Sequence, residues 1–225
     1  MPVFNASLTT IDEKETRRYA GLMKAADFPQ HLIQDACDEA RMLVQPKGIW
    51  QLYDYNQEAS RIEAPFPYLL TGAKIIAYLK EAKKTAVLAV TIGEALENSI
   101  SEHFAKGNYT YALLLDAAGT TAVEMAADQL SKAVEQQANK MGFTTLARFS
   151  PGYGDWEITE QPQVLKLAAG QTVGIEVTDS CMLLPRKSVT AVIGFIPFRK
   201  SASCKEVRCT GCTQQNCLAR KDEPT

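Results

Sequence analysis

Residues Val173 to Phe198 read VGIEVTDSCMLLPRKSVTAVIGFIPF, and they carry the clearest indication of how the chain is built. Branched and aromatic residues are concentrated at 173–177 and 189–198, so we expect a strand in each of these segments. The connection between them is too short for the crossover helix that joins parallel neighbours. This region therefore favours antiparallel pairing.

Upstream of these strands, helical and strand patterns are interspersed without regular alternation. Residues 85–92 form a nearly continuous apolar run, as expected for a strand buried on both faces. Residues 143–149 predict another strand, and Thr10 with Glu13 has the form of a capping box that opens an early helix. A long helix is predicted over 111–140. Its small residues, which allow close packing, are Ala112, Ala117, Ala118, Gly119, Ala122, Ala126 and Ala127. This mixture predicts an α+β fold with a mainly antiparallel sheet flanked by helices.

Composition and charge narrow the range of functions. The chain has 225 residues, of which 46% are hydrophobic and 22% charged, and its formal net charge is -2. It lacks the basic surplus that nucleic-acid binding needs, so we expect no nucleic-acid partner. The first residues lack the pattern of a signal peptide, and no apolar run approaches the roughly 20 residues that span a membrane. We therefore expect a cytoplasmic protein without a membrane partner.

The segment from Arg148 to Trp156, RFSPGYGDW, is the most unusual in the chain. Its Pro151, Gly152 and Gly154 favour a tight turn. An arginine, aromatic side chains and a carboxylate surround that turn. Two interpretations are open: a strand-to-loop turn whose aromatic side chains cap the core, or a binding loop.

Four segments, taken together and in order, resemble the activation domain of cobalamin-dependent methionine synthase. They are Val90-Thr91-Ile92-Gly93; Leu115-Asp116-Ala117-Ala118-Gly119 with Glu124, Ala127 and Asp128; Arg148-x-x-Pro151-Gly152-Tyr153; and Val177-Thr178-x-Ser180-x-Met182-x-x-Pro185-x-x-Ser188-Val189. The first two are similar to a strand and the long helix of that family. The third resembles its S-adenosylmethionine-binding loop, and the fourth its next signature. The resemblance spans residues 70–198.

The resemblance implies an activity and a site. In this family, one-electron reduction of cob(II)alamin is coupled to methyl transfer from S-adenosylmethionine to cob(I)alamin, which restores an oxidised methyltransferase. The resemblance implies that Arg148 holds the methionyl carboxylate, as a guanidinium fork can. It also implies that the peptide groups of Pro151 and Gly152 approach the ligand, and that Tyr153 contacts ligand and corrin as the catalytic residue. From its charge, we further expect Asp155 beside the sulfonium, with a cation–π contact from the next residue, a tryptophan, as the alternative.

The chain departs from the family at several points. Its loop continues Gly154-Asp155-Trp156-Glu157, where the family has Pro-Ala-Cys-Pro and a histidine. The family's later tyrosine pair has no counterpart after Phe198, and its acidic ligand contact nearer the N-terminus has no clear match. No corrinoid domain is recognisable. Cobalamin is therefore expected on a partner, a methionine synthase or another corrinoid protein, with a flavodoxin or ferredoxin-type protein as reductant.

The last part of the chain is rich in cysteine. Cys204, Cys209, Cys212 and Cys217 form C-x4-C-x2-C-x4-C, which is too compact for two separate zinc knuckles. The run resembles iron–sulfur binding segments without matching a standard ferredoxin spacing. Four thiolates also suit zinc, and ordinary thiols or disulfides remain a third interpretation. We expect an activation-like domain over 1–200 and a metal-binding tail over 201–225.

Three functions follow from these features. The first is reactivation in trans of a cobalamin-dependent methyltransferase. The second is an iron–sulfur electron-transfer or docking subunit of a corrinoid methyltransferase that binds no S-adenosylmethionine. The third is a non-catalytic chaperone that caps a corrinoid partner. Binding of S-adenosylmethionine separates the first from the others, and metal content separates the second from the third.

Overall fold

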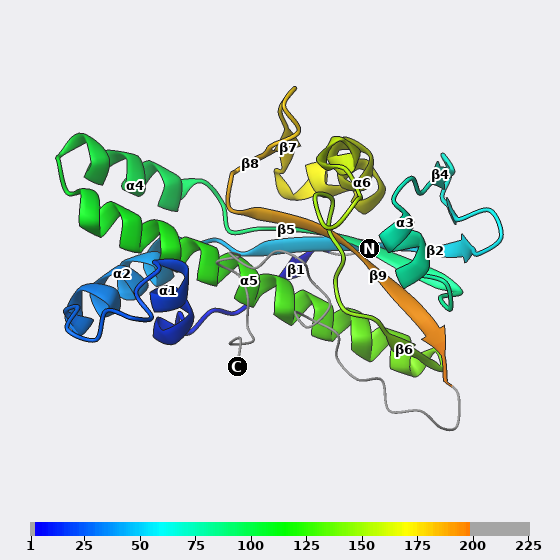
Figure 1. The fold of residues 1–225 in the computed structure, drawn as a ribbon, viewed down its shortest axis with the longest axis horizontal. Coiled ribbons are helices and arrows are strands. Elements are labelled where there is room, and N and C mark those ends of the chain that lie inside the picture. The colour runs from blue at the N-terminus through cyan, green and yellow to red at the C-terminus, as the bar shows by residue number, and fades with distance from the viewer. Residues whose placement is uncertain (1–2, 199–225) are drawn as a thin grey trace.

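A computed structural model describes residues 3–198 of the protein (Figure 1). The cysteine-rich tail predicted for 201–225 lies outside this range. Within it, no helix combines the length and apolar character needed to cross a membrane. The elements in chain order are β1 (Phe4–Asn5), α1 (Glu13–Tyr19), α2 (Gln30–Leu43), β2 (Lys47–Asn56), β3 (Arg61–Glu63), β4 (Tyr68–Leu69), α3 (Ala73–Tyr78), β5 (Lys84–Thr91), α4 (Ala95–Ala105), α5 (Tyr109–Lys140), β6 (Phe143–Thr145), η1 (Ile158–Glu160), α6 (Gln161–Ala168), η2 (Gly170–Val173), β7 (Glu176–Val177), β8 (Leu183–Leu184) and β9 (Ser188–Pro197).

The main sheet has the strand order β4-β3-β2-β5-β9-β6, and β1 pairs with β2 at the side of this path. Every pairing in it is antiparallel, so the predicted α+β class with an antiparallel sheet is confirmed. The centre is formed by the long strands β2, β5 and β9. In their register, Leu88 of β5 lies opposite Trp50 on one side and Ala191 on the other.

Helices cover both faces of the sheet, which explains the continuous apolar run in β5. Leu88 and Val90 point into a core formed with α2, α4 and α5. Val87 and Ala89, their neighbours in sequence, point into a second core formed with α3 and α6. Figure 1 shows α5 along one face of the sheet and α6 on the other. Successive side chains of a strand alternate between faces, so both sets must be apolar.

Small residues let α5 lie close to its neighbours, as predicted. Ala118, Ala122 and Ala126 are fully buried. A Cβ atom on Gly119 would lie 2.3 Å from the Cδ2 atom of Leu96 on α4, so no larger residue fits there without movement of that side chain. The small residues of α5 therefore set the distance between these helices.

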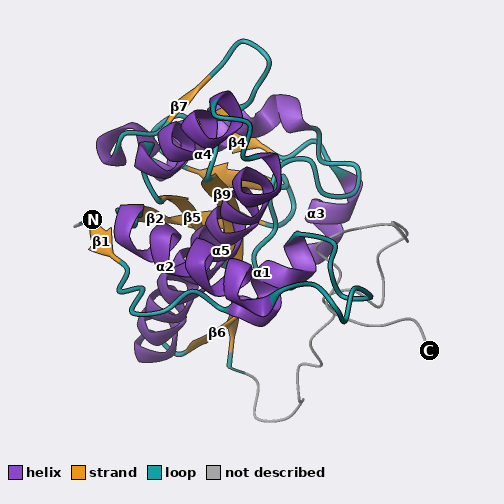
Figure 2. Ribbon diagram, turned by 90° about the vertical axis from the view of Figure 1, so that its left-hand side faces the viewer, coloured by secondary structure: helices purple, strands orange, loops and turns teal. Residues whose placement is uncertain are grey.

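Three local predictions were wrong. The strand expected at 173–177 is shorter and lies outside the main sheet, because β7 pairs with β8 in a two-stranded hairpin that projects from the body (Figures 1 and 2). The strand expected at 143–149 ends at Thr145; the N–H of Leu146 still donates to the carbonyl of Gly194 in β9, and Phe149 pairs with Val192 in an isolated bridge. The cap of α1 is Asp12, whose carboxylate accepts the N–H of Glu15 at 3.0 Å. An aspartate caps as well as a threonine, so sequence spacing alone did not choose between them.

Candidate functional site

The loop predicted to bind a ligand begins where the chain pairs with the middle of β9. Phe149 and Val192 exchange both backbone hydrogen bonds, at 2.9 and 2.8 Å, in an isolated bridge. The chain then turns away from the sheet. The N–H of Gly152 donates to the carbonyl of Trp156 at 2.7 Å, which closes a compact loop. This bridge fixes where Arg148, the residue before it, lies relative to α5.

Arg148 points to α5 and forms ion pairs there. Its Nη2 lies 2.8 Å from Oε2 of Glu124 and 3.1 Å from Oδ1 of Asp128, while Nη1 lies 3.5 Å from the hydroxyl of Ser131. The Arg148 side chain is 18% exposed, against 37% for Glu124 and 50% for Asp128. A guanidinium has five N–H donors. Arg148 therefore keeps donor capacity for a further anion at a position that solvent reaches.

The same face of α5 carries a longer row of polar residues, which we call the α5 polar stripe: Asp116, Thr120, Glu124 and Asp128. Residues four apart lie on one face of a helix. Lys187, just before β9, contacts the two N-terminal residues of the stripe, with its Nζ 2.9 Å from Asp116 and 2.8 Å from the Thr120 hydroxyl. Lys187 was not among the residues predicted from the sequence, although the carboxylates on α5, eight and four residues apart, mark the helix face that it contacts.

The tip of the loop is open to solvent. Pro151 is buried, whereas Gly152, Tyr153, Gly154 and Asp155 are exposed, and Tyr153 is 55% exposed. Gly152 and Gly154 have φ angles of +88° and +64°, a region that residues with side chains avoid. The sequence-based expectation of a glycine-bent turn is confirmed. The arrangement presents a tyrosine at the tip, within a few residues of a cation.

Asp155 and Trp156 both contact other parts of the fold. The two carboxylate oxygens of Asp155 accept the N–H groups of Ala73 and Lys74, each at 3.0 Å. Trp156 is 1% exposed and belongs to the second core, with its Nε1 3.3 Å from the hydroxyl of Tyr68. The interpretation of the tryptophan as a core residue is thus confirmed. A contact between Asp155 and S-adenosylmethionine stays a prediction.

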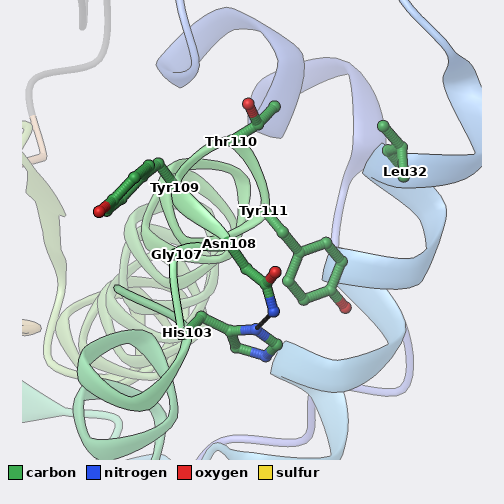
Figure 3. A pocket seen from close by; sticks show the side chains of 7 residues that line it. All are labelled: Leu32, His103, Gly107, Asn108, Tyr109, Thr110 and Tyr111. Carbon is green, nitrogen blue, oxygen red and sulfur yellow. Dashed lines mark hydrogen bonds between the residues drawn. The ribbon is translucent and has the colours of Figure 1, made fainter. Parts of the chain in front are cut away.

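Two cavities lie elsewhere. The larger, of about 440 Å³, is an open depression at the turn between α4 and α5 (Figure 3). In it the amide of Asn108 and Nδ1 of His103 are 3.5 Å apart, and Tyr111 points to α2.

On α2, Glu39 accepts hydrogen bonds from Ser99 at 2.5 Å and from Tyr111 at 2.9 Å. Burial would raise the pKa of Glu39, but these hydrogen bonds and His103 outweigh it and lower that pKa. A smaller cavity lies near Gly93. Neither cavity is lined by Arg148 or Tyr153.

Comparisons with known proteins bear on the fold. No protein-family profile matches the sequence, and no curated protein matches it. Among solved structures, the crystal structure of the MetH reactivation domain bound to AdoHcy is similar, with a TM-score of 0.62 at 16% sequence identity. The similarity covers 90% of this chain and 81% of that chain, and so extends beyond residues 70–198. The chain has the fold of the MetH reactivation domain.

Proposed function

We propose that the protein reactivates, in trans, a cobalamin-dependent methyltransferase of the methionine synthase type. The observation that carries this proposal is the fold, shared over nine-tenths of the chain with a reactivation domain that was crystallised with AdoHcy. AdoHcy is what remains of S-adenosylmethionine once its methyl group has been transferred. A fold alone does not define a function, so the argument also depends on the loop and the α5 polar stripe.

The proposed reaction has two steps. A flavodoxin or ferredoxin-type protein gives one electron to cob(II)alamin on the partner, which yields cob(I)alamin. The cobalt then attacks the methyl carbon of S-adenosylmethionine, a Co–C bond forms, and the S–C bond breaks with its electron pair left on sulfur. The products are methylcobalamin and S-adenosylhomocysteine. The second step consumes cob(I)alamin, so it draws an unfavourable reduction forward: a tenfold change in population corresponds to about 59 mV for one electron.

The residues around Arg148 suit the amino-acid end of S-adenosylmethionine. That end is a zwitterion, and it needs a cation for its carboxylate and an anion for its ammonium group. In this proposal Arg148 supplies the first, as the family resemblance implies, and Glu124 and Asp128, within 3.1 Å of it, supply the second. Pro151 and Gly152 then lie along the ligand, with Tyr153 turned to the corrin ring. In this proposal the exposed tip is where the partner's cobalamin docks.

Reactivation can be tested with a methionine synthase that lacks its own activation domain and holds cob(II)alamin. We expect the wild-type protein, with S-adenosylmethionine labelled in its methyl group and a flavodoxin reductant, to produce labelled methylcobalamin. Tyr153→Ala should reduce the rate at least about tenfold, because the side chain that faces the reacting pair is removed. Absence of labelled methylcobalamin from a protein that binds S-adenosylmethionine contradicts the proposal. A pull-down from cell extract, analysed for cobalamin, identifies the natural partner.

The cysteine run supports a second candidate, an iron–sulfur electron-transfer or docking subunit that binds no S-adenosylmethionine. Cys204, Cys209, Cys212 and Cys217 lie outside the described residues, so the argument rests on their spacing. We expect protein purified without oxygen to absorb visible light and to contain iron and acid-labile sulfide, both lost in Cys209→Ser with Cys212→Ser. Colourless protein with stoichiometric zinc ends the electron-relay hypothesis. Calorimetry with S-adenosylmethionine separates this candidate from the first.

A further inference from the structure

The exposed loop tip is attached to a segment far away in sequence. Asp155 accepts the N–H groups of Ala73 and Lys74, the first two residues of α3. The residue at the N-cap position of α3 is Gly72, which has no side chain to cap the helix. A carboxylate that follows the tip of the loop thus performs the capping that the local sequence does not.

Two glycines allow this contact to form. A Cβ atom on Gly72 would lie 3.0 Å from both Cα and Cβ of Trp156, so the two backbones pack directly on one another. A Cβ atom on Gly154 would lie 2.5 Å from Cδ of Lys74. The loop therefore approaches the start of α3 more closely than larger residues at 72 and 154 would permit.

A second pair of hydrogen bonds secures the other end of the contact. Glu160 accepts from the hydroxyl of Tyr68 at 2.6 Å and from the hydroxyl of Thr71 at 2.8 Å. Burial raises the pKa of Tyr68, and so does its bond to Glu160, which keeps the phenol protonated as a donor. The segments 68–74 and 154–160 together form what we call the loop clamp.

The geometry points to Asp155 as a positioning residue that orients Tyr153 by capping α3, in place of a role as a ligand of S-adenosylmethionine. Both of its oxygens are already occupied by backbone donors, and Tyr153 is two residues away on an exposed turn. The tip also has contacts of its own, among them the hydrogen bond from the N–H of Tyr153 to the carbonyl of Ser150 at 3.1 Å and a ring contact between Tyr153 and Phe149, whose centroids are 5.9 Å apart. The clamp adds the attachment to α3. The orientation of Tyr153 to a corrin ring rests on the proposed function, whereas the clamp does not.

Asp155→Ala and Asp155→Asn separate positioning from charge. Asparagine keeps one of the two accepting oxygens, but its NH2 group cannot accept the second N–H and it carries no charge. We expect the amides of residues 150 and 152–156 to exchange with deuterium about tenfold faster in Asp155→Ala and at an intermediate rate in Asp155→Asn. In the methyl-transfer assay, Asp155→Ala should lower kcat about fivefold with KM for S-adenosylmethionine nearly unchanged, and Asp155→Asn should keep more of the wild-type kcat than Asp155→Ala does. Glu157→Ala removes a neighbouring exposed carboxylate and serves as the matched control.

These measurements test the clamp and the proposed function separately. Unchanged exchange in Asp155→Ala overturns the clamp, whatever the protein's activity. Equal loss of S-adenosylmethionine affinity in Asp155→Asn and Asp155→Ala, measured by calorimetry, shows that the negative charge is a ligand and also overturns the positioning role. Failure of the proposed function appears in the wild-type protein, as absence of methyl transfer, and leaves the exchange measurement intact. The two failures are therefore distinguishable.

Discussion

Arg148→Ala should weaken the binding of S-adenosylmethionine at least about thirtyfold, a loss of about 2 kcal/mol or more. The guanidinium is only 18% exposed and is held in place by Glu124 and Asp128, so its attraction for a carboxylate is little weakened by solvent. The variant also leaves those two carboxylates beside the methionyl carboxylate, where they repel it. Isothermal calorimetry on the folded variant measures the effect.

Two further variants make this result specific. Arg148→Lys keeps the charge but not the planar fork, so we expect an intermediate affinity. Arg186→Ala removes an exposed cation close to Lys187 and should change affinity by less than about twofold. Wild-type affinity in Arg148→Ala removes this residue from the site, and equal losses in Arg148→Ala and Arg186→Ala reveal a general effect of charge.

Trp156→Ala should lower the free energy of unfolding by about 3–5 kcal/mol, a large part of the stability of a typical domain. The indole is 1% exposed, and its ring centroid lies 6.1 Å from that of Phe149, where the loop leaves the sheet. Its removal leaves a cavity in the second core and removes the surface against which Gly72 packs. Urea unfolding followed by circular dichroism measures the loss without depending on tryptophan fluorescence.

A phenylalanine at the same position is the matched control. Trp156→Phe keeps most of the apolar volume and loses the hydrogen bond from Nε1 to Tyr68, so a smaller loss of about 1–2 kcal/mol is expected. A loss below about 1 kcal/mol in Trp156→Ala contradicts the assignment of this side chain to the core. Similar losses in both variants assign the stabilisation to the hydrogen bond instead of the packing.

Features that depend on residues close together in the sequence were predicted well. The apolar run of β5 and the small residues of α5 indicate buried positions directly, because the polarity and size of each side chain suit the environment in which it lies. The turn at Gly152 and Gly154 follows from backbone sterics alone. The antiparallel sheet was also predicted correctly, although the strand near Ile175 pairs with β8 instead of entering the main sheet. Short hairpins of this kind have no signature that separates them from sheet strands.

Contacts between distant segments could not be predicted in this way. Asp155 meets Ala73 at a sequence separation of 82 residues, and Lys187 meets Thr120 at a separation of 67. A carboxylate in an exposed turn has the same appearance in sequence whether it caps a remote helix or binds a ligand. Only the folded backbone, here the close approach at Gly72, distinguishes these roles.

The bridge between Phe149 and Val192 joins the start of the loop to the centre of the sheet. On its other side Val192 pairs with Val87 of β5, so backbone pairing connects Phe149 through β9 to a strand that is buried on both faces. A segment anchored in this way opens only together with the sheet, whereas an exposed turn can move alone. Arg148 and Tyr153, five residues apart, thus stand at the rigid and the adaptable end of one short segment.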